Sequence, residues 1–132
     1  MPTAESVIHC AEEFVCFVIE QPMPDVRVVR VSGELDLLTT PLLEIRLQQC
    51  IEKRVGHLVV DLGGVTFLGA AGLTSLVAAR KAATGLGVQL HLSGTDHRAV
   101  ARPLDITMLR PSFDIHPTAD AVVAVVSSRK AS

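Results

Sequence analysis

Short apolar runs with strand-like and helix-like spacing alternate along the chain. Continuous or alternating apolar positions predict strands over residues 14–19, 26–31, 58–62, 88–92 and 113–115. Pro22 and Pro24 place a turn between the first two strands, because proline cannot donate to the hydrogen-bond ladder inside a sheet. So short a connection favours an antiparallel hairpin. The run 58–62 lacks alternation, which is typical of a parallel strand buried on both faces.

Helical spacing follows each of the later strands. Thr40 and Pro41 predict the cap and the first turn of a helix that buries Leu43 and Leu47 on one face. Pro103 is expected to end or kink the third helix of the chain. The other helices are expected over residues 73–83, 97–102 and 119–127. The order of elements therefore predicts an α/β fold, with an initial antiparallel hairpin, then mostly parallel strands, packed with about four helices.

The size and composition fit one domain with one core. The chain has 132 residues, of which 48% are hydrophobic and 3% aromatic. We expect residues 1–13 to form a loose lead-in, residues 14–127 the domain and residues 128–132 a polar tail. The net charge of −2 gives no reason to expect nucleic acid or an anionic membrane as a partner. Without a secretory signal or an apolar run of about 20 residues, we expect no membrane insertion and a cytoplasmic location.

The cysteines show no metal-binding pattern. Cys10, Cys16 and Cys50 are unevenly spaced, and their odd number argues against a disulfide framework. Each is expected to be a small buried apolar residue. The alternative is a redox pair formed by Cys10 and Cys16.

The five histidines are scattered over different predicted elements. His91 and His97 are the closest pair in sequence, but the pattern offers neither a third ligand nor the second shell that a metal site needs. We therefore expect hydrogen-bonded or solvated histidines, with no metal and no cofactor.

No set of residues predicts catalysis. Asp36 and Asp61 lie near strand ends without a nucleophile or base beside them, so we expect them to cap or brace loops. Asp36 stands before a helix and is also a candidate for partner contact. No lysine follows the glycines as it does in a phosphate-binding loop, so we expect no nucleotide site there. We also expect that the protein is not an enzyme. Gly63, Gly64, Gly69 and Gly72 are expected to permit tight turns and close helix packing. The alternative is a small-ligand pocket lined by Gly63, Gly64 and Gly69.

The turn from Phe67 to Leu73 joins a buried strand to a helix, a position where α/β proteins place their sites. It reads Phe-Leu-Gly-Ala-Ala-Gly-Leu and holds no charge, hydroxyl or thiol. Such a turn offers backbone groups and shape to a partner, but no side-chain chemistry.

Three segments together resemble the STAS domain of bacterial anti-sigma-factor antagonists. They are residues 31–36 with the helix after Thr40, residues 58–67, and Gly72-Leu73 with its helix. The pattern over residues 109–121 fits the same family. The resemblance implies a STAS-like mixed sheet, in agreement with the order of elements above. It also implies a regulatory partner, an anti-sigma factor or a related kinase-like regulator.

In that family the strand-to-helix turn reads Asp-Ser-Ser/Thr-Gly-Leu, and an anti-sigma kinase phosphorylates the first serine. This chain has Gly69 and Ala70 at the aspartate and serine positions. The resemblance therefore implies a docking surface without its switch, because alanine cannot carry a phosphate. The nearby hydroxyls of Thr66, Thr74 and Ser75 are expected to be structural.

The sequence thus predicts a non-catalytic protein-interaction domain, constitutively active or controlled by abundance, a ligand or thiol chemistry. Its candidate contact residues are Leu35, Asp36, Thr39, Leu68, Gly69, Ala70, Leu73 and Ser75. Two other functions stay open, an accessory subunit of an ABC-type transport complex and a small-ligand sensor. Formation of a homodimer also stays open.

Overall fold

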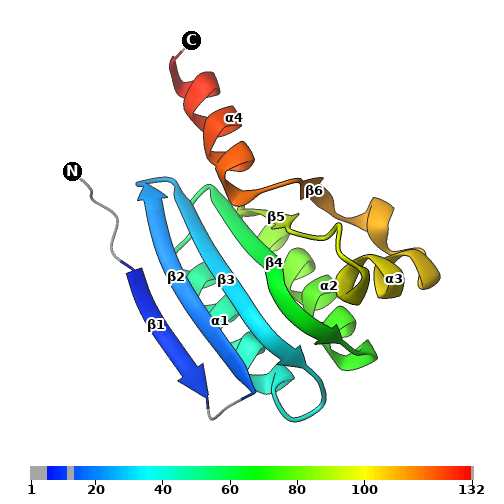
Figure 1. Cartoon of the computed structure of the whole chain (residues 1–132). Helices are drawn as coiled ribbons and strands as arrows, with labels where there is room; N and C mark the ends of the chain where they lie inside the picture. The colour runs from blue at the N-terminus through cyan, green and yellow to red at the C-terminus, as the bar shows by residue number, and fades with distance from the viewer. Residues whose placement is uncertain (1–5, 12–13, 132) are drawn as a thin grey trace.

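Six strands form one mixed sheet, in which neighbours in the sheet are also neighbours in sequence (Figure 1). The computed structural model describes residues 6–11 and 14–131. The strands are β1 (Ser6–Ala11), β2 (Val15–Met23), β3 (Val26–Leu35), β4 (His57–Leu68), β5 (Gln89–Ser93) and β6 (Asp114–His116). The pairs β1–β2 and β2–β3 are antiparallel, and the pairs from β3 to β6 are parallel. The predicted mixed sheet is therefore confirmed.

The sheet extends one strand further than the sequence predicts. β1 lies within residues 1–13, which were expected to form a loose lead-in, and it pairs with β2 from Ser6 opposite Glu20 to Ala11 opposite Val15. The boundary of the domain at residue 14 stays a prediction. The pairing shows that regular structure begins before it.

Four α-helices lie within the described residues, together with one short 3-10 turn. They are α1 (Thr40–Glu52), α2 (Ala70–Gly85), α3 (Arg98–Ile106) and α4 (Ala119–Ala131), with the 3-10 turn at Arg110–Ser112. None of these helices is long and apolar enough to cross a membrane.

One local prediction about the helices is wrong, and one alternative of a second prediction does not hold. The N-cap of α1 is Thr39 rather than Thr40, and the Thr39 side chain makes no capping bond to the helix. Pro103 was expected to end or kink α3, and it does not end the helix, which continues to Ile106. Val100 and Leu104 are both fully buried on this helix, so the packing of its inner face outweighs the hydrogen bond that proline removes.

Alternation along β4 sends its side chains to two cores on opposite faces of the sheet. Leu58, Val60 and Leu62 join the larger core, to which α1, α2 and α3 also contribute. Val59 joins the smaller core under α4. Figure 1 shows that α4 covers only one end of this second face, so the rest of that face on β2, β3 and β4 carries no helix.

β4 runs through the two glycines that were expected to form a tight turn. Gly63 and Gly64 lie inside the strand, beside a shift in its register with β3. A Cβ atom on Gly64 would lie 2.7 Å from the Cβ of Ser32, so glycine permits the close approach of β3. The strand continues until Leu68 pairs with Leu35, and the carboxyl ends of β3 and β4 meet at one edge.

Candidate partner-binding surface

Hydrogen bonds around Asp36 hold the loop between β3 and α1 in one shape. The Asp36 carboxylate accepts from the backbone N–H groups of Leu38 and Thr39, at 2.9 and 3.0 Å. The Thr39 hydroxyl donates to the carbonyl of Glu34 at 2.6 Å and accepts from the N–H of Asp36 at 3.0 Å. These bonds, the one from the Thr39 backbone first, lower the pKa of Asp36. The prediction that Asp36 braces a loop is confirmed.

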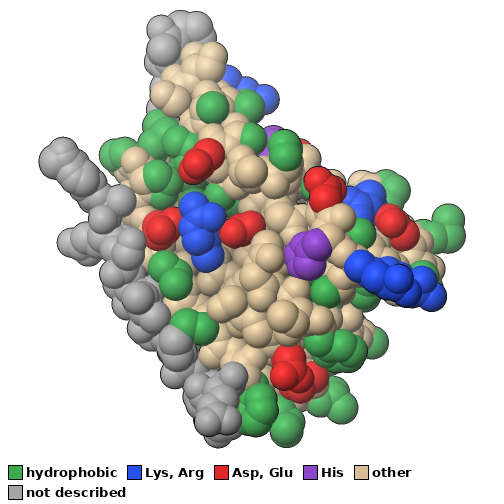
Figure 2. Space-filling view, viewed as in Figure 1, with side chains coloured by type: hydrophobic (Ala, Val, Ile, Leu, Met, Phe, Trp, Pro, Cys, Tyr) green, Lys and Arg blue, Asp and Glu red, His purple; other side chains and the backbone are tan. Residues whose placement is uncertain are grey.

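The braced loop leaves two adjacent leucines in solvent. Leu37 is 82% exposed and Leu38 is 85% exposed. Figure 2 shows hydrophobic side chains gathered at the lower edge of the molecule, where β3 and β4 end in Figure 1. Burial of one leucine side chain contributes about 1.5–3 kcal/mol, so such a pair is suited to contact with a partner.

The turn between β4 and α2 is tied to the same loop. The N–H of Gly69 donates to the carbonyl of Leu35 at 2.9 Å. A Cβ atom on Gly72 would lie 3.2 Å from the Cβ of Leu35, so the start of α2 packs closely against the end of β3. Ala70 is the first residue of α2 and is exposed, and Phe67 on the same edge is 51% exposed.

Five of the eight residues expected to contact a partner have buried side chains. They are no more than 5% exposed: Leu35, Thr39, Leu68, Leu73 and Ser75. They therefore support the surface from below and do not form it. Of the predicted set, Asp36, Gly69 and Ala70 remain accessible.

Three exposed residues of this edge, Leu37, Leu38 and Phe67, are ones that the sequence reasoning missed. We use the name contact surface for Asp36, Leu37, Leu38, Phe67 and Ala70. The alternation of side chains along β3 could have shown that Leu35 is buried. Leu35 lies an even number of residues from the buried Val29 and Val31. Continuing this alternation places Leu35 in the core.

A groove of about 650 Å³ runs between α1 and α2. Within it the Ser75 hydroxyl donates to the Glu44 carboxylate at 2.6 Å. A second groove of about 400 Å³ lies beside α2, with Ala70 in its lining. Neither groove is lined by Gly63, Gly64 or Gly69, the residues considered for a small-ligand pocket.

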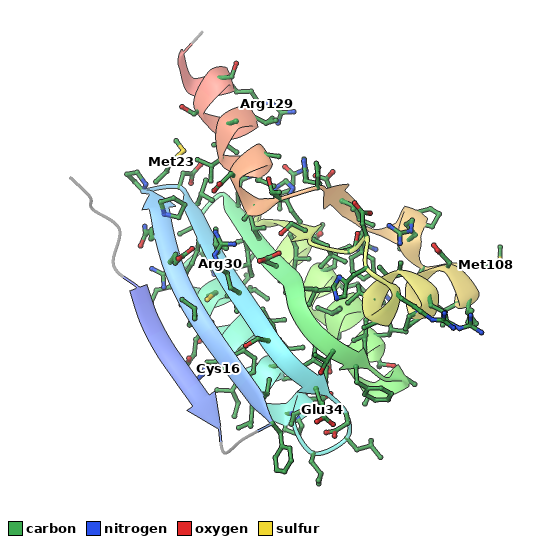
Figure 3. The ribbon with its side chains drawn as sticks, in the orientation of Figure 1. Cys16, Met23, Arg30, Glu34, Met108 and Arg129 are labelled. Atoms are coloured by element: carbon green, nitrogen blue, oxygen red, sulfur yellow. The ribbon has the colours of Figure 1, made fainter. Side chains whose placement is uncertain are left out.

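Asp61 lies inside β4 and takes part in a row of charges on the open face of the sheet. Its carboxylate accepts from Arg30 at 3.1 Å and from the Ser93 hydroxyl at 3.1 Å. Arg30, labelled in Figure 3, also pairs with Glu20 at 2.8 Å. The expected loop role of Asp61 is therefore wrong, because β4 continues beyond it.

Three histidines from different strands meet on the face of the sheet that carries α4. Nδ1 of His57 lies 3.0 Å from Nε2 of His91, and Nδ1 of His91 lies 3.2 Å from Nε2 of His116. The Asp114 carboxylate is 2.8 Å from Nδ1 of His91. Desolvation lowers the pKa of His91 to about 4, although Asp114 acts against this shift. His97 stands apart, with Nε2 2.8 Å from the carbonyl of Val65.

We expect acid to destabilise the fold through His91. The unfolded chain binds a proton at this residue near pH 6.5 and the folded chain only near pH 4. Because the unfolded state binds more protons between these values, stability falls as the pH is lowered, by about 3 kcal/mol at most. Urea unfolding across this pH window, with a chelator present, measures the slope. His91→Gln should remove much of it and His97→Gln should not, whereas equal slopes in all three proteins would refute the assignment.

The cysteines differ from one another in the structure. Cys50 is a buried free thiol whose pKa is raised by burial, as expected for an unreactive cysteine. Cys16 is disulfide-bonded, so its interpretation as a simple buried thiol is wrong. Its Cα partner across the β1–β2 pair is Cys10, whose side chain lies outside the described part of the structure.

Comparison with known proteins identifies the family. The family model of the STAS domain matches residues 20–122. The anti-sigma-F factor antagonist RsfB of Mycobacterium tuberculosis is 30% identical over 105 residues, covering 79% of this chain and 84% of RsfB. The chain therefore belongs to the STAS domain family.

Solved structures show the same fold. A crystal structure of an anti-sigma factor antagonist from Mycobacterium paratuberculosis has a TM-score of 0.73 and 32% identity, covering 89% of this chain and 97% of that one. Unphosphorylated SpoIIAA, also an anti-sigma factor antagonist, has a TM-score of 0.69 at 16% identity, covering 84% and 96%. SLC26A9, whose murine form is an anion transporter, shares the fold over 21% of its own chain, at 14% identity and a TM-score of 0.65. The chain is thus an anti-sigma-factor-antagonist-like STAS domain.

Proposed function

We propose that this chain is a non-catalytic regulator that binds an anti-sigma factor through the contact surface and does so without a phosphorylation switch. The observation that carries the proposal is the pair of exposed leucines, Leu37 and Leu38, on a loop braced by hydrogen bonds. The likeness to anti-sigma factor antagonists, at 30% and 32% identity, supports an anti-sigma factor as the class of partner.

The braced loop favours binding because its shape exists before the partner arrives. Loop ordering on association costs about 0.5–1.5 kcal/mol for each immobilised side chain. The bonds from Leu38 and Thr39 to Asp36 fix the backbone in the free protein. The partner therefore meets a preformed apolar edge, to which the half-exposed Phe67 at the end of the neighbouring strand also contributes.

The absence of a switch rests on Ala70. This residue is the first of α2, where free backbone N–H groups and the helix dipole would stabilise a phosphate. Alanine has no hydroxyl to accept one. Ser75 is 4% exposed and bonded to Glu44, so a kinase would reach it poorly. We propose that binding is therefore constitutive, with control by abundance of the protein.

Isothermal titration with purified anti-sigma factors from the source genome tests the proposed partner class. We expect one of them to form a one-to-one complex without added nucleotide. If none binds, and a transporter ATPase is instead retained by the immobilised chain, the accessory-subunit alternative replaces this proposal. Stabilisation by a small molecule alone would favour the ligand-sensor alternative.

A further inference from the structure

The histidine cluster lies on three adjacent strands because of the register of the sheet. His91 pairs with Asp114, and Ser93 pairs with His116, so these side chains share one face of β5 and β6. His57 lies two residues before Val59 on β4, so its side chain is on the same face of the sheet, which carries α4. From there it contacts His91. Leu92 and Ile115, at the intervening positions, face the opposite core. The fold therefore assembles a group that the linear sequence separates.

We infer that His91, His116 and Asp114 form a binding site for a divalent transition-metal ion, with Zn²⁺ as the best fit. Nδ1 of His91, Nε2 of His116 and a carboxylate oxygen of Asp114 all lie within 4.8 Å of one another. Two imidazoles and one carboxylate form a ligand set that suits Zn²⁺, and calcium and magnesium prefer oxygen ligands.

The separations between the ligand atoms fit tetrahedral coordination. Metal–ligand bonds of about 2.0–2.2 Å at tetrahedral angles place ligand atoms about 3.3–3.6 Å apart. Nδ1 of His91 lies 3.2 Å from Nε2 of His116 and 2.8 Å from Oδ2 of Asp114. Nε2 of His116 lies 3.4 Å from Oδ1 of Asp114. Small rotations of these side chains would therefore suffice to admit an ion.

Two further residues orient the ligands. Nε2 of His91 lies 3.0 Å from Nδ1 of His57, so a metal on Nδ1 of His91 leaves its other nitrogen to donate to His57. Gln89 donates to Oδ2 of Asp114 at 2.9 Å and fixes the carboxylate. These hydrogen bonds hold the ligand side chains in place, and the sequence alone did not reveal them.

The site combines a dry interior with an entrance for the ion. The side chain of His91 is 5% exposed, that of His116 is 20% exposed and that of Asp114 is 45% exposed. The Asp114 carboxylate accepts from Nδ1 of His91 at 2.8 Å, so binding of the ion at this nitrogen would displace its proton. The ion would enter beside Asp114 and keep a water molecule as its fourth ligand. The ion would attach the three-residue strand β6 to β5. It would thereby also hold the start of α4, which follows β6 after residues 117–118.

Competition between the metal-stripped chain and a chromophoric chelator for Zn²⁺ tests the site. We expect one Zn²⁺ per chain, and with Co²⁺ the visible absorption of tetrahedral coordination. His116→Gln and Asp114→Asn should each lower the Zn²⁺ affinity at least about 100-fold, and His57→Gln about tenfold. Circular dichroism should show that these partly exposed positions tolerate the changes.

Two matched controls separate the site from adventitious binding. His97→Gln and Asp105→Asn make the same chemical changes outside the cluster, at a histidine bonded to Val65 and at an exposed aspartate. Both should keep the wild-type affinity and stoichiometry. Equal Zn²⁺ affinity in all variants, or no one-to-one binding by the wild type, would overturn the inference and leave a hydrogen-bonded histidine cluster.

Discussion

Replacing Leu37 and Leu38 together by aspartate is expected to weaken binding to the anti-sigma factor at least about 100-fold. Each leucine loses at least about 1.5 kcal/mol of apolar burial in the complex, and 1.4 kcal/mol corresponds to a factor of ten in affinity. Two unpaired carboxylates at the centre of the interface add a desolvation cost. Titration calorimetry against the partner measures the change.

The fold of this double variant should be intact, because both side chains lie in solvent. Its free energy of unfolding is expected to stay within about 0.5 kcal/mol of the wild type. Ile106→Asp with Met108→Asp is the matched control, since these residues are 67% and 81% exposed, at the end of α3 and just beyond it. The control should bind normally. Wild-type affinity in the Leu37/Leu38 variant would show that the partner docks elsewhere.

Leu35→Ala is expected to cause a large loss of stability, unlike the Leu37/Leu38 variant, which should keep its fold and lose binding. Leu35 is the last residue of β3, and its side chain is fully buried against the start of α2. Truncation of a buried leucine to alanine costs about 2–5 kcal/mol, because it removes apolar contacts and leaves a cavity. Urea unfolding at neutral pH measures the loss, and Leu37→Ala, two residues further along, should cost less than about 0.5 kcal/mol.

Comparing Leu35→Ala with Leu37→Ala shows whether the Leu35 side chain stabilises the fold or contacts the partner. If Leu35→Ala unfolds as the wild type does but fails to bind, the side chain is a contact residue after all, as the sequence first suggested. If Leu35→Ala is less stable and its folded fraction still binds, the placement in the core is upheld.

The order of elements was predictable because local patterns agree with the fold. The apolar run over residues 58–62 is buried as a parallel strand, and the helical spacing of Leu43 and Leu47 matches the inner face of α1. β1 was missed because an edge strand can form by pairing with β2 without a strong hydrophobic pattern of its own. The length of β4 was missed because Gly63 and Gly64 indicate a turn locally, whereas close packing on β3 requires glycine inside the strand.

The location of the candidate site was predictable, but the roles of its residues were not. The 35–40 loop and the 67–73 turn lie together because parallel strands end at the same edge. Which side chains point outward depends on how the loop closes, and the Asp36 bonds decide this at Leu37 and Leu38. The histidine cluster depends on the register of β5 and β6, which the sequence does not state.

Affinity for the anti-sigma factor, before and after incubation with ATP and that factor as kinase, tests the central claim most directly. The wild type should gain no phosphoryl group by intact mass and should bind equally in both states. Gly69→Asp with Ala70→Ser restores the family residues, and a Cβ atom at position 69 would lie 3.1 Å from the movable ring of Phe67. This variant should be phosphorylated and lose affinity, because the phosphate adds about −1.5 to −2 charges to an apolar surface. Stoichiometric phosphate on Thr66, Thr74 or Ser75 of the wild type, with loss of binding, would contradict the account.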